Sequence, residues 1–271
     1  MKSGELVLLC GERMQTAVAR RLRAKHCRCT LVRVPAGAEL GAFVASWQRT
    51  RAGRHARMVV ILCLIASTSS AVLSTELARR GALYLDAPLT GTIRDAARGA
   101  LTVIASGPKA AFEHAKPALD AIGSSVFYVG RRPGAAQLMH QINGSLASIL
   151  FAVACEVYVT GAKAGLPAEA MAQVFSNGSG KNAASARIIP EQVVTRRFRH
   201  GKRIADACHE LTMMSEEADR QGVTMWVGGK ANQLYALAAQ LGRPQDDITR
   251  LVTHYEKWAK VEVKATGRKR A

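Results

Sequence analysis

The chain has 271 residues, of which 48% are hydrophobic, 5% aromatic and 21% charged. This length suits one large domain or two modest ones, and the composition excludes a chain that is disordered throughout. The formal net charge of +18 is spread along the sequence rather than gathered in one block, so an ordinary basic surface is the favoured interpretation.

The first half of the chain alternates strand-like and helix-like segments. Apolar runs predict strands at residues 5–10, 29–34, 58–64, 82–85, 101–105 and 125–129. Helical periodicity and capping residues predict helices at residues 14–24, 40–48, 67–80 and 108–122. Such alternation predicts an α/β fold with a doubly wound, Rossmann-like parallel sheet.

The second half of the chain has a different character. The motif Gly130-Arg-Arg-Pro-Gly134 breaks the alternation, and residues 135–164 contain no proline and are apolar on nearly every side. We therefore predict a long interdomain helix that other helices bury. Further helices are predicted at residues 169–175, 191–197, 204–221, 230–241 and 247–260.

These patterns divide the chain into three parts. An α/β dinucleotide-binding domain is predicted at residues 1–131 and an all-α domain at residues 132–264. A disordered basic tail is predicted at residues 265–271.

The segment Tyr84-Leu-Asp-Ala-Pro-Leu-Thr-Gly91 carries the most specific signal. It resembles the D-A-P-V-S-G signature of the β-hydroxyacid dehydrogenases, NAD(P)-dependent enzymes related to 3-hydroxyisobutyrate dehydrogenase. Residues 96–104 continue like that family's A-x-x-G-T-L-T-I-M stretch. Because ligands of open α/β sheets bind beyond the strand ends, the resemblance implies that Asp86, Thr90 and Gly91 bind a small carboxylate substrate.

A second match opens the long helix. Residues 134–143 resemble the family's G-x-G-Q-x-x-K-x-x-N-N motif, with His140 at the position of the catalytic lysine. The resemblance implies that His140 and Asn143 are catalytic, His140 as acid/base, since imidazole titrates near neutral pH, and Asn143 by orienting the substrate. Gly144 replaces the second Asn. His209 stands where the family has a second lysine, which implies a substrate-binding role for it.

The dinucleotide fingerprint departs from the family. With Met14 as the anchor, Cys10, Glu12 and Gln15 replace the glycines of G-x-G-x-M-G. A Cβ obstructs the close approach of a pyrophosphate, and Glu12 adds a negative charge there. In addition, residues 59–64 run almost directly into residues 67–70, so about one strand and one helix of the family pattern are missing.

The cofactor contacts that the resemblance still implies lie around this damaged fingerprint. The second strand ends near Arg33, which is compatible with a 2′-phosphate and favours NADP over NAD. The remaining predicted cofactor-binding residues are Gly11, Arg13, Met14, Ser67 and Thr68.

Three functional hypotheses remain open at this point. The first is a working NAD(P)-dependent dehydrogenase of a small 3-hydroxy acid, and the family resemblance then implies a homodimer or homotetramer. The second is a family fold that has lost its chemistry and serves as a binding or scaffold protein. The third, a basic nucleic-acid-associated module, is disfavoured because no helix-turn-helix or zinc finger is visible.

Other features point to a cytoplasmic protein without a metal. The six cysteines are scattered, and the single C-x-C pair has poor zinc spacing. No apolar run reaches the ~18 residues of a membrane span, and the N-terminus lacks the pattern of a signal peptide.

Overall fold

The computed structural model describes residues 6–35 and 40–265. The chain forms two compact units, Met1–His140, called here the α/β unit, and Gln141–Ala271, the helical unit. Each is described by itself. The division falls inside a long helix, nine residues after the boundary predicted at residue 131. Of the predicted basic tail at residues 265–271, all but Ala265 lies outside the described residues.

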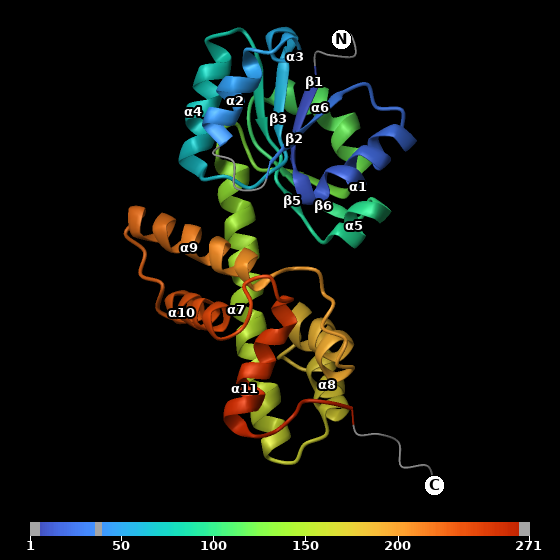
Figure 1. The fold of residues 1–271 in the computed structure, drawn as a ribbon, viewed down its shortest axis with the longest axis vertical. Helices are drawn as coiled ribbons and strands as arrows, with labels where there is room; N and C mark the ends of the chain where they lie inside the picture. The colour runs from blue at the N-terminus through green and yellow to red at the C-terminus, as the bar shows by residue number, and fades with distance from the viewer. Residues whose placement is uncertain (1–5, 36–39, 266–271) are drawn as a thin grey trace. The chain divides into compact units, whose positions relative to one another are not determined.

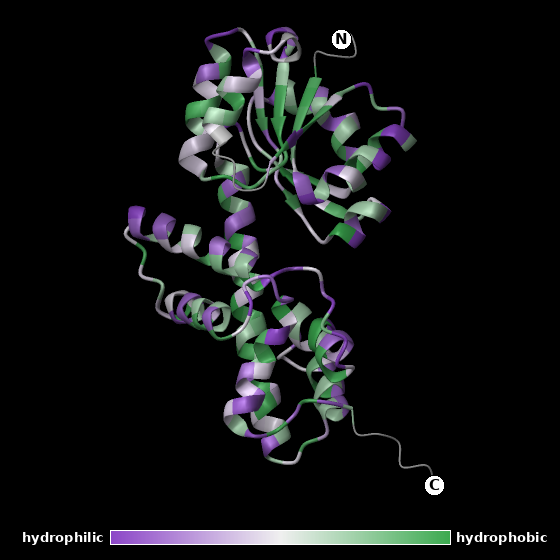
Figure 2. Cartoon of the chain, in the orientation of Figure 1, coloured by the Kyte–Doolittle hydropathy of each residue, from purple (hydrophilic) through white to green (hydrophobic). Residues whose placement is uncertain are grey.

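A four-stranded parallel sheet forms the centre of the α/β unit (Figure 1). Its strands lie in the order β2 (Thr30–Val34), β1 (Leu6–Gly11), β3 (Met58–Ile61) and β4 (Leu83–Asp86). Alternate residues of β1 and β3 enter hydrophobic clusters on opposite faces of the sheet. Burial on both faces explains why these strands are continuous apolar runs, which Figure 2 shows in green.

Helices cover both faces of this sheet. Helices α1 (Glu12–Ala24) and α6 (Lys109–Ile122) supply the cluster on one face. On the other face lie α2 (Leu40–Gln48) and α4 (Ser67–Ala78). Because β1 leads to α1 and the adjacent β3 leads to α4, the chain changes face between these two strands. Their carboxyl ends therefore form a topological switch point, the place where α/β sheets bind ligands.

A second, three-stranded sheet completes the α/β unit. Strands β6 (Leu101–Ala105) and β7 (Gly123–Tyr128) are parallel, and β5 (Leu89–Thr90) pairs antiparallel with β6. A single bridge between Asp86 and Ser106 connects the two sheets. The sequence did not predict β5, nor the short helices α3 (Arg51–His55) and α5 (Ile93–Arg98). A two-residue strand cannot show alternation, and five or six residues complete fewer than two helical turns.

The helical unit is built on the long helix α7 (Ala135–Lys163), whose first residues belong to the α/β unit. The elements that follow are α8 (Ala168–Asn177), the π-helix η1 (Ala184–Val194), α9 (Ile204–Arg220), α10 (Trp226–Leu241), the 3₁₀ turn η2 (Ile248–Arg250) and α11 (Leu251–Ala259). Residues 191–194 of the helix predicted at residues 191–197 are the end of a π-helix that begins at Ala184, and residues 195–197 lie beyond that helix. In the core, the fully buried Tyr158 donates its hydroxyl to the Ser185 carbonyl at 2.8 Å.

Helix α7 differs from its prediction in one respect. We expected burial on nearly every side, but Ile142, Leu146, Val153 and Val157 lie along one exposed apolar stripe at helical spacing. In length and composition α7 could also cross a membrane, and 44% of its most apolar stretch is buried in the protein. Buried core helices of globular proteins share this length and composition.

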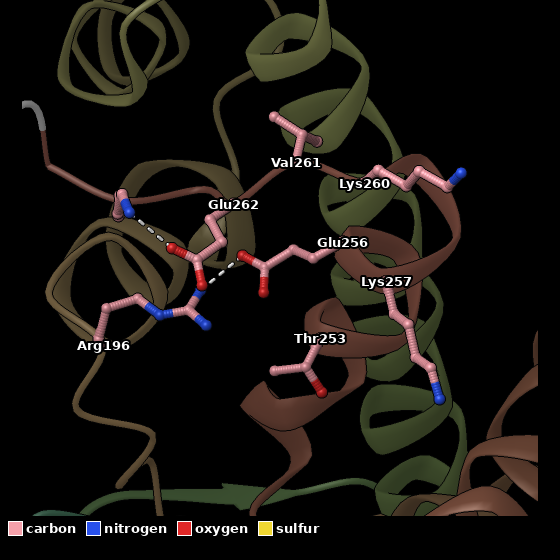
Figure 3. A pocket seen from close by; sticks show the side chains of 8 residues that line it. Arg196, Thr253, Glu256, Lys257, Lys260, Val261 and Glu262 are labelled. Atoms are coloured by element: carbon pink, nitrogen blue, oxygen red, sulfur yellow. Dashed lines mark hydrogen bonds and ion pairs between the residues drawn. The ribbon is translucent and has the colours of Figure 1, made fainter.

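An ion pair holds the C-terminal segment of the helical unit. Arg196 donates to the buried Glu256 carboxylate at 2.5 Å, and the Val263 N–H donates to the same oxygen at 2.8 Å. Figure 3 shows this pair and the Glu262 carboxylate beside an open hollow of about 710 Å³. No residue that the sequence singled out as functional lines this hollow.

Candidate active site

Asp86 is the last residue of β4, and its side chain is fully buried, with 0% exposure. Its Oδ1 accepts from the Tyr84 hydroxyl at 2.7 Å and from Gln137 Nε2 at 3.1 Å. Its Oδ2 accepts from Ser70 Oγ at 2.5 Å and from the Gly134 backbone N–H at 2.7 Å. Asp86 therefore joins β4, α4 and the start of α7 by hydrogen bonds.

Tyr84 is a permanent donor in this cluster. Burial, together with the neighbouring Asp86 carboxylate, raises the pKa of Tyr84 well above its ordinary value, so the phenol keeps its proton. The sequence did not single out Tyr84, Ser70 or Gln137 as functional. Gln137 was visible in the match to the G-x-G-Q motif, but serine and tyrosine on a buried face give no sequence signal of a common partner.

Gln137 also connects α7 to the loop that follows β3. Its Oε1 accepts from the Ile65 N–H at 3.1 Å, and its Nε2 donates to the Cys63 carbonyl at 3.2 Å. A Cβ at Gly134 would lie 2.5 Å from the Ser67 carbonyl oxygen, so the chain before α7 packs directly on the first residue of α4. The start of α7 is thereby fixed at the carboxyl edge of the sheet.

Thr90 and His140 meet in the α/β unit. The hydroxyl oxygen of Thr90 lies 3.0 Å from Nδ1 of His140, and the imidazole is buried. Thr90 comes from β5 and His140 from the second turn of α7, fifty residues apart. The two motifs that carry the family resemblance are therefore in direct contact at this hydrogen bond.

The structure gives a reason for glycine at position 91 that differs from the ligand-binding role suggested by the sequence. Its φ is +135°, and a Cβ there would lie 2.8 Å from the Leu101 side chain. Glycine is therefore required by the backbone and by packing against β6, in addition to any approach of a ligand. The next residue, Thr92, caps α5 in a capping box with Asp95, which fixes the end of the loop.

The remaining predicted substrate residues lie in the helical unit. Asn143 is exposed on α7, one turn after His140, and His209 is exposed on α9. At Gly144, which replaces the second Asn, a Cβ would lie 2.3 Å from a carboxylate oxygen of Glu210, so the Glu210 side chain would have to move to admit a larger residue. That carboxylate pairs with Lys202 at 2.6 Å, a lysine that the sequence analysis did not consider.

The switch point carries the predicted cofactor residues. Gly11 ends β1 in an extended conformation, nothing lies within 4 Å of a Cβ built on it, and α1 begins at Glu12 without a side-chain cap. Helix α4 begins at Ser67, also without a side-chain cap. Arg13 and Thr68 follow in the first turns of α1 and α4, both exposed.

Glu12 and Arg33 form an exposed ion pair at the same edge. Arg33 Nη1 lies 3.1 Å from Glu12 Oε1. The arginine therefore partly offsets the negative charge of the carboxylate in the first turn of α1. Met14, used as the anchor of the fingerprint, is half-buried and packs against the core.

Two cysteines also stand at this edge, but their chemistry is that of core residues. Burial raises the pKa of Cys10, which lies near Cys63, to about 12, and burial raises the pKa of Cys63 to about 12 as well. Both thiols are protonated at neutral pH, so neither is an activated nucleophile. Across residues 6–35 and 40–265, no cluster of three or more metal-ligating side chains is found.

Comparison with known proteins assigns both parts of the chain. Residues 7–130 match the model of the NAD binding domain of 6-phosphogluconate dehydrogenase. Residues 134–255 match that of the NAD-binding domain of NADP-dependent 3-hydroxyisobutyrate dehydrogenase. The chain belongs to the 3-hydroxyisobutyrate dehydrogenase family.

Individual relatives agree with this assignment. The 2-(hydroxymethyl)glutarate dehydrogenase of Eubacterium barkeri is 26% identical over 76% of this chain and 68% of its own. The L-threonate dehydrogenase of Escherichia coli O6:H1 is 36% identical over 46% of this chain. That second match spans only 41% of the E. coli enzyme. In fold, the 3-hydroxyisobutyrate dehydrogenase of Mycobacterium tuberculosis gives a TM-score of 0.77 at 18% identity, over 92% of this chain and 98% of that one.

The family's dinucleotide fits the donors at the switch point. Helices α1 and α4 begin at the carboxyl ends of β1 and β3 without a side-chain cap, and nothing lies within 4 Å of a Cβ built on Gly11. Backbone N–H groups at helix N-termini are the donors that a diphosphate requires. The negative charge of Glu12 would repel the diphosphate, and the ion pair of Glu12 with Arg33 reduces this repulsion.

Proposed function

We propose that the protein is an NAD(P)-dependent dehydrogenase that oxidises the hydroxyl group of a small hydroxy acid. The observation that carries this proposal is the 3.0 Å contact between Thr90 and His140. It brings the residue at the position of the family's catalytic lysine next to the loop proposed to bind the substrate carboxylate. Relatives named as dehydrogenases of L-threonate and of 2-(hydroxymethyl)glutarate support this substrate class.

His140 is proposed as the acid/base. A neutral imidazole that donates its Nδ1–H to Thr90 carries its lone pair on Nε2, and this nitrogen accepts the proton of the substrate hydroxyl. The charged ring that results keeps the same hydrogen bond. When bound, the nicotinamide supplies the hydride acceptor.

Thr90 has two roles in this proposal. Its oxygen accepts from the imidazole, and its own hydroxyl proton remains to donate to the substrate carboxylate. Gly91 contributes a backbone N–H beside it. We propose that Asn143 orients the substrate hydroxyl and that His209 contacts the substrate, as their positions in the family motifs suggest.

We propose NADP rather than NAD as the cofactor. Arg33 lies at the end of β2, where a cation suits a 2′-phosphate, and Gly11, Arg13, Met14, Ser67 and Thr68 surround the rest of the dinucleotide.

The test is a direct assay of the full-length protein. NADP or NAD is supplied with L-threonate, L-serine, 3-hydroxyisobutyrate and 2-(hydroxymethyl)glutarate, and formation of the reduced cofactor is followed at 340 nm. Turnover with one of these acids, faster with NADP, is the expected result. If no acid is oxidised and NADPH does not bind more tightly than ~100 μM, the dehydrogenase assignment is wrong and the scaffold hypothesis is favoured.

We propose a homodimer or homotetramer as the working assembly. The exposed apolar stripe of α7 and a second one on α10, formed by Trp226, Val227, Leu237 and Leu241, support it. Trp226 is 82% exposed, and apolar surface of this extent is typical of a subunit interface.

Disruption of the α10 stripe is expected to dissociate this assembly. The double variant Val227→Glu/Leu241→Glu should raise the dissociation constant at least about tenfold, because two charges would be buried in an apolar interface. Analytical ultracentrifugation measures it. The control Phe127→Glu changes an exposed apolar residue of the α/β unit and should leave the assembly intact. A wild-type protein that sediments as a monomer at 50 μM would contradict the proposal.

The compartment is proposed to be the cytoplasm. All six cysteines are free thiols, as is usual where glutathione and thioredoxin keep thiols reduced.

A further inference from the structure

We infer that Asp86 is a positioning residue rather than a substrate ligand. Its buried carboxylate holds the first turn of α7 in place and so determines where the His140 imidazole lies relative to Thr90. The inference rests on the proposed function of His140. It changes the role of Asp86 from the one expected from the family motif, because a side chain with 0% exposure has no surface to offer a substrate.

The donors to Asp86 come from separate segments of the α/β unit. Tyr84 and Ser70 donate from β4 and α4, and Gly134 and Gln137 donate from the beginning of α7. If all four donors were absent, the buried carboxylate would have no hydrogen-bond partner among them, and this would cost a large amount of folding free energy. The strength of each bond comes from the charge of the acceptor, so the cluster is tight only with a carboxylate at its centre.

Ser106 extends the cluster to a second backbone amide. The Ser106 hydroxyl lies 3.4 Å from Asp86 Oδ2. The oxygen of that hydroxyl accepts from the Ala136 N–H at 2.9 Å. At the start of α7, the Gly134 N–H thus donates to Asp86 and the Ala136 N–H donates to Ser106, which itself lies against Asp86. A carboxylate at a helix N-terminus is also favoured by the helix dipole.

Both partners of the Thr90–His140 contact lie close to Asp86 along the chain. His140 follows Gln137 by three residues, one helical turn, so a rotation or shift of the first turn of α7 moves the imidazole by a similar amount. Thr90, the last residue of β5, follows Asp86 by four residues. A single buried side chain therefore sets the position of the acid/base and of its hydrogen-bond partner together.

The variant Asp86→Asn removes the negative charge and one acceptor oxygen of the side chain while its shape stays the same. An amide keeps the volume but replaces one acceptor oxygen by an NH₂ group, which would face donors instead of accepting from them. The start of α7 should shift, and a displacement of about 1 Å at a catalytic group costs roughly a hundredfold in rate. We expect kcat to fall 10- to 100-fold, while KM and the Kd of NADPH change less than threefold.

A second readout does not depend on turnover. Long-range ¹H–¹⁵N NMR spectra report the tautomer and titration of each imidazole, with the His140 signal identified by its absence in His140→Gln. In Asp86→Asn the His140 signals should move while those of His114, exposed on α6, stay. Hydrogen exchange at Gly134 and Ala136 should become at least tenfold faster. The milder variant Tyr84→Phe removes one donor and should shift the same signals less.

The control is Asp120→Asn, which changes an exposed carboxylate on α6 that pairs with Lys116 at 2.7 Å and should leave kcat and the His140 signals unchanged. Unchanged His140 signals in both Asp86→Asn and Tyr84→Phe would overturn the inference. So would a rise in KM of tenfold or more with kcat unchanged, because that pattern belongs to a substrate ligand. A wild-type protein without turnover, whose His140 signals still respond to Asp86→Asn, would refute the proposed function and leave the positioning role standing.

Discussion

Replacing His140 by glutamine is expected to lower kcat by about 10²- to 10⁴-fold, the usual contribution of a positioned acid/base. Glutamine can keep a hydrogen bond to Thr90, which lies 3.0 Å from Nδ1 in the native protein, but it cannot take up a proton. The Kd of NADPH should change little, because His140 is not among the residues proposed to hold the dinucleotide. Steady-state kinetics at saturating cofactor measures the effect.

The matched control for this variant is His114→Gln, which alters an exposed histidine on α6 and should leave kcat unchanged. Thr90→Val should reduce kcat and raise KM together, because it removes both the imidazole partner and a donor to the substrate, whereas Thr90→Ser keeps the hydroxyl and should restore most of the activity. Equal rates for wild-type protein and His140→Gln would show that another group carries the proton.

Replacing Glu12 by glutamine is expected to strengthen dinucleotide binding by about 5- to 10-fold. The carboxylate stands in the first turn of α1, where the diphosphate is proposed to bind, and like charges repel there. Glu12 and Arg33 are both about half-exposed, so solvent screening limits the gain to about 1 kcal/mol. The substitution also releases Arg33 from its ion pair.

Fluorescence titration with NADPH measures the Kd in wild-type protein and in Glu12→Gln. Repeating the titration at higher salt tests whether the difference is electrostatic. The gain should shrink as ionic strength rises, because exposed charges are screened. Glu113→Gln, which removes an exposed carboxylate on α6, is the control and should not alter the Kd. Weaker binding in Glu12→Gln would mean that the carboxylate contacts the cofactor productively, or that the diphosphate lies elsewhere.

The architecture of the α/β unit could be predicted from local patterns. Strands β1 and β3 are buried on both faces, so they are continuous apolar runs, and α1 shows the period of a helix with one buried side. The two-residue strand β5 and the five-residue helix α3 were missed, because neither is long enough to repeat the period of its own structure.

The sequence by itself also determined the family and its candidate residues. The motif at residues 84–91 and the motif at residues 134–143, which contains His140, are both runs of consecutive residues and can be recognised without the structure. Only the tertiary structure decided which groups donate to Asp86 and which side of α7 is covered. The hydrogen bonds of Asp86 to Gly134 and Gln137 join residues about fifty positions apart, and the exposed stripe of α7 depends on which helices pack against it. Contacts of this kind are set by how the chain returns on itself, for which local periodicity carries no information.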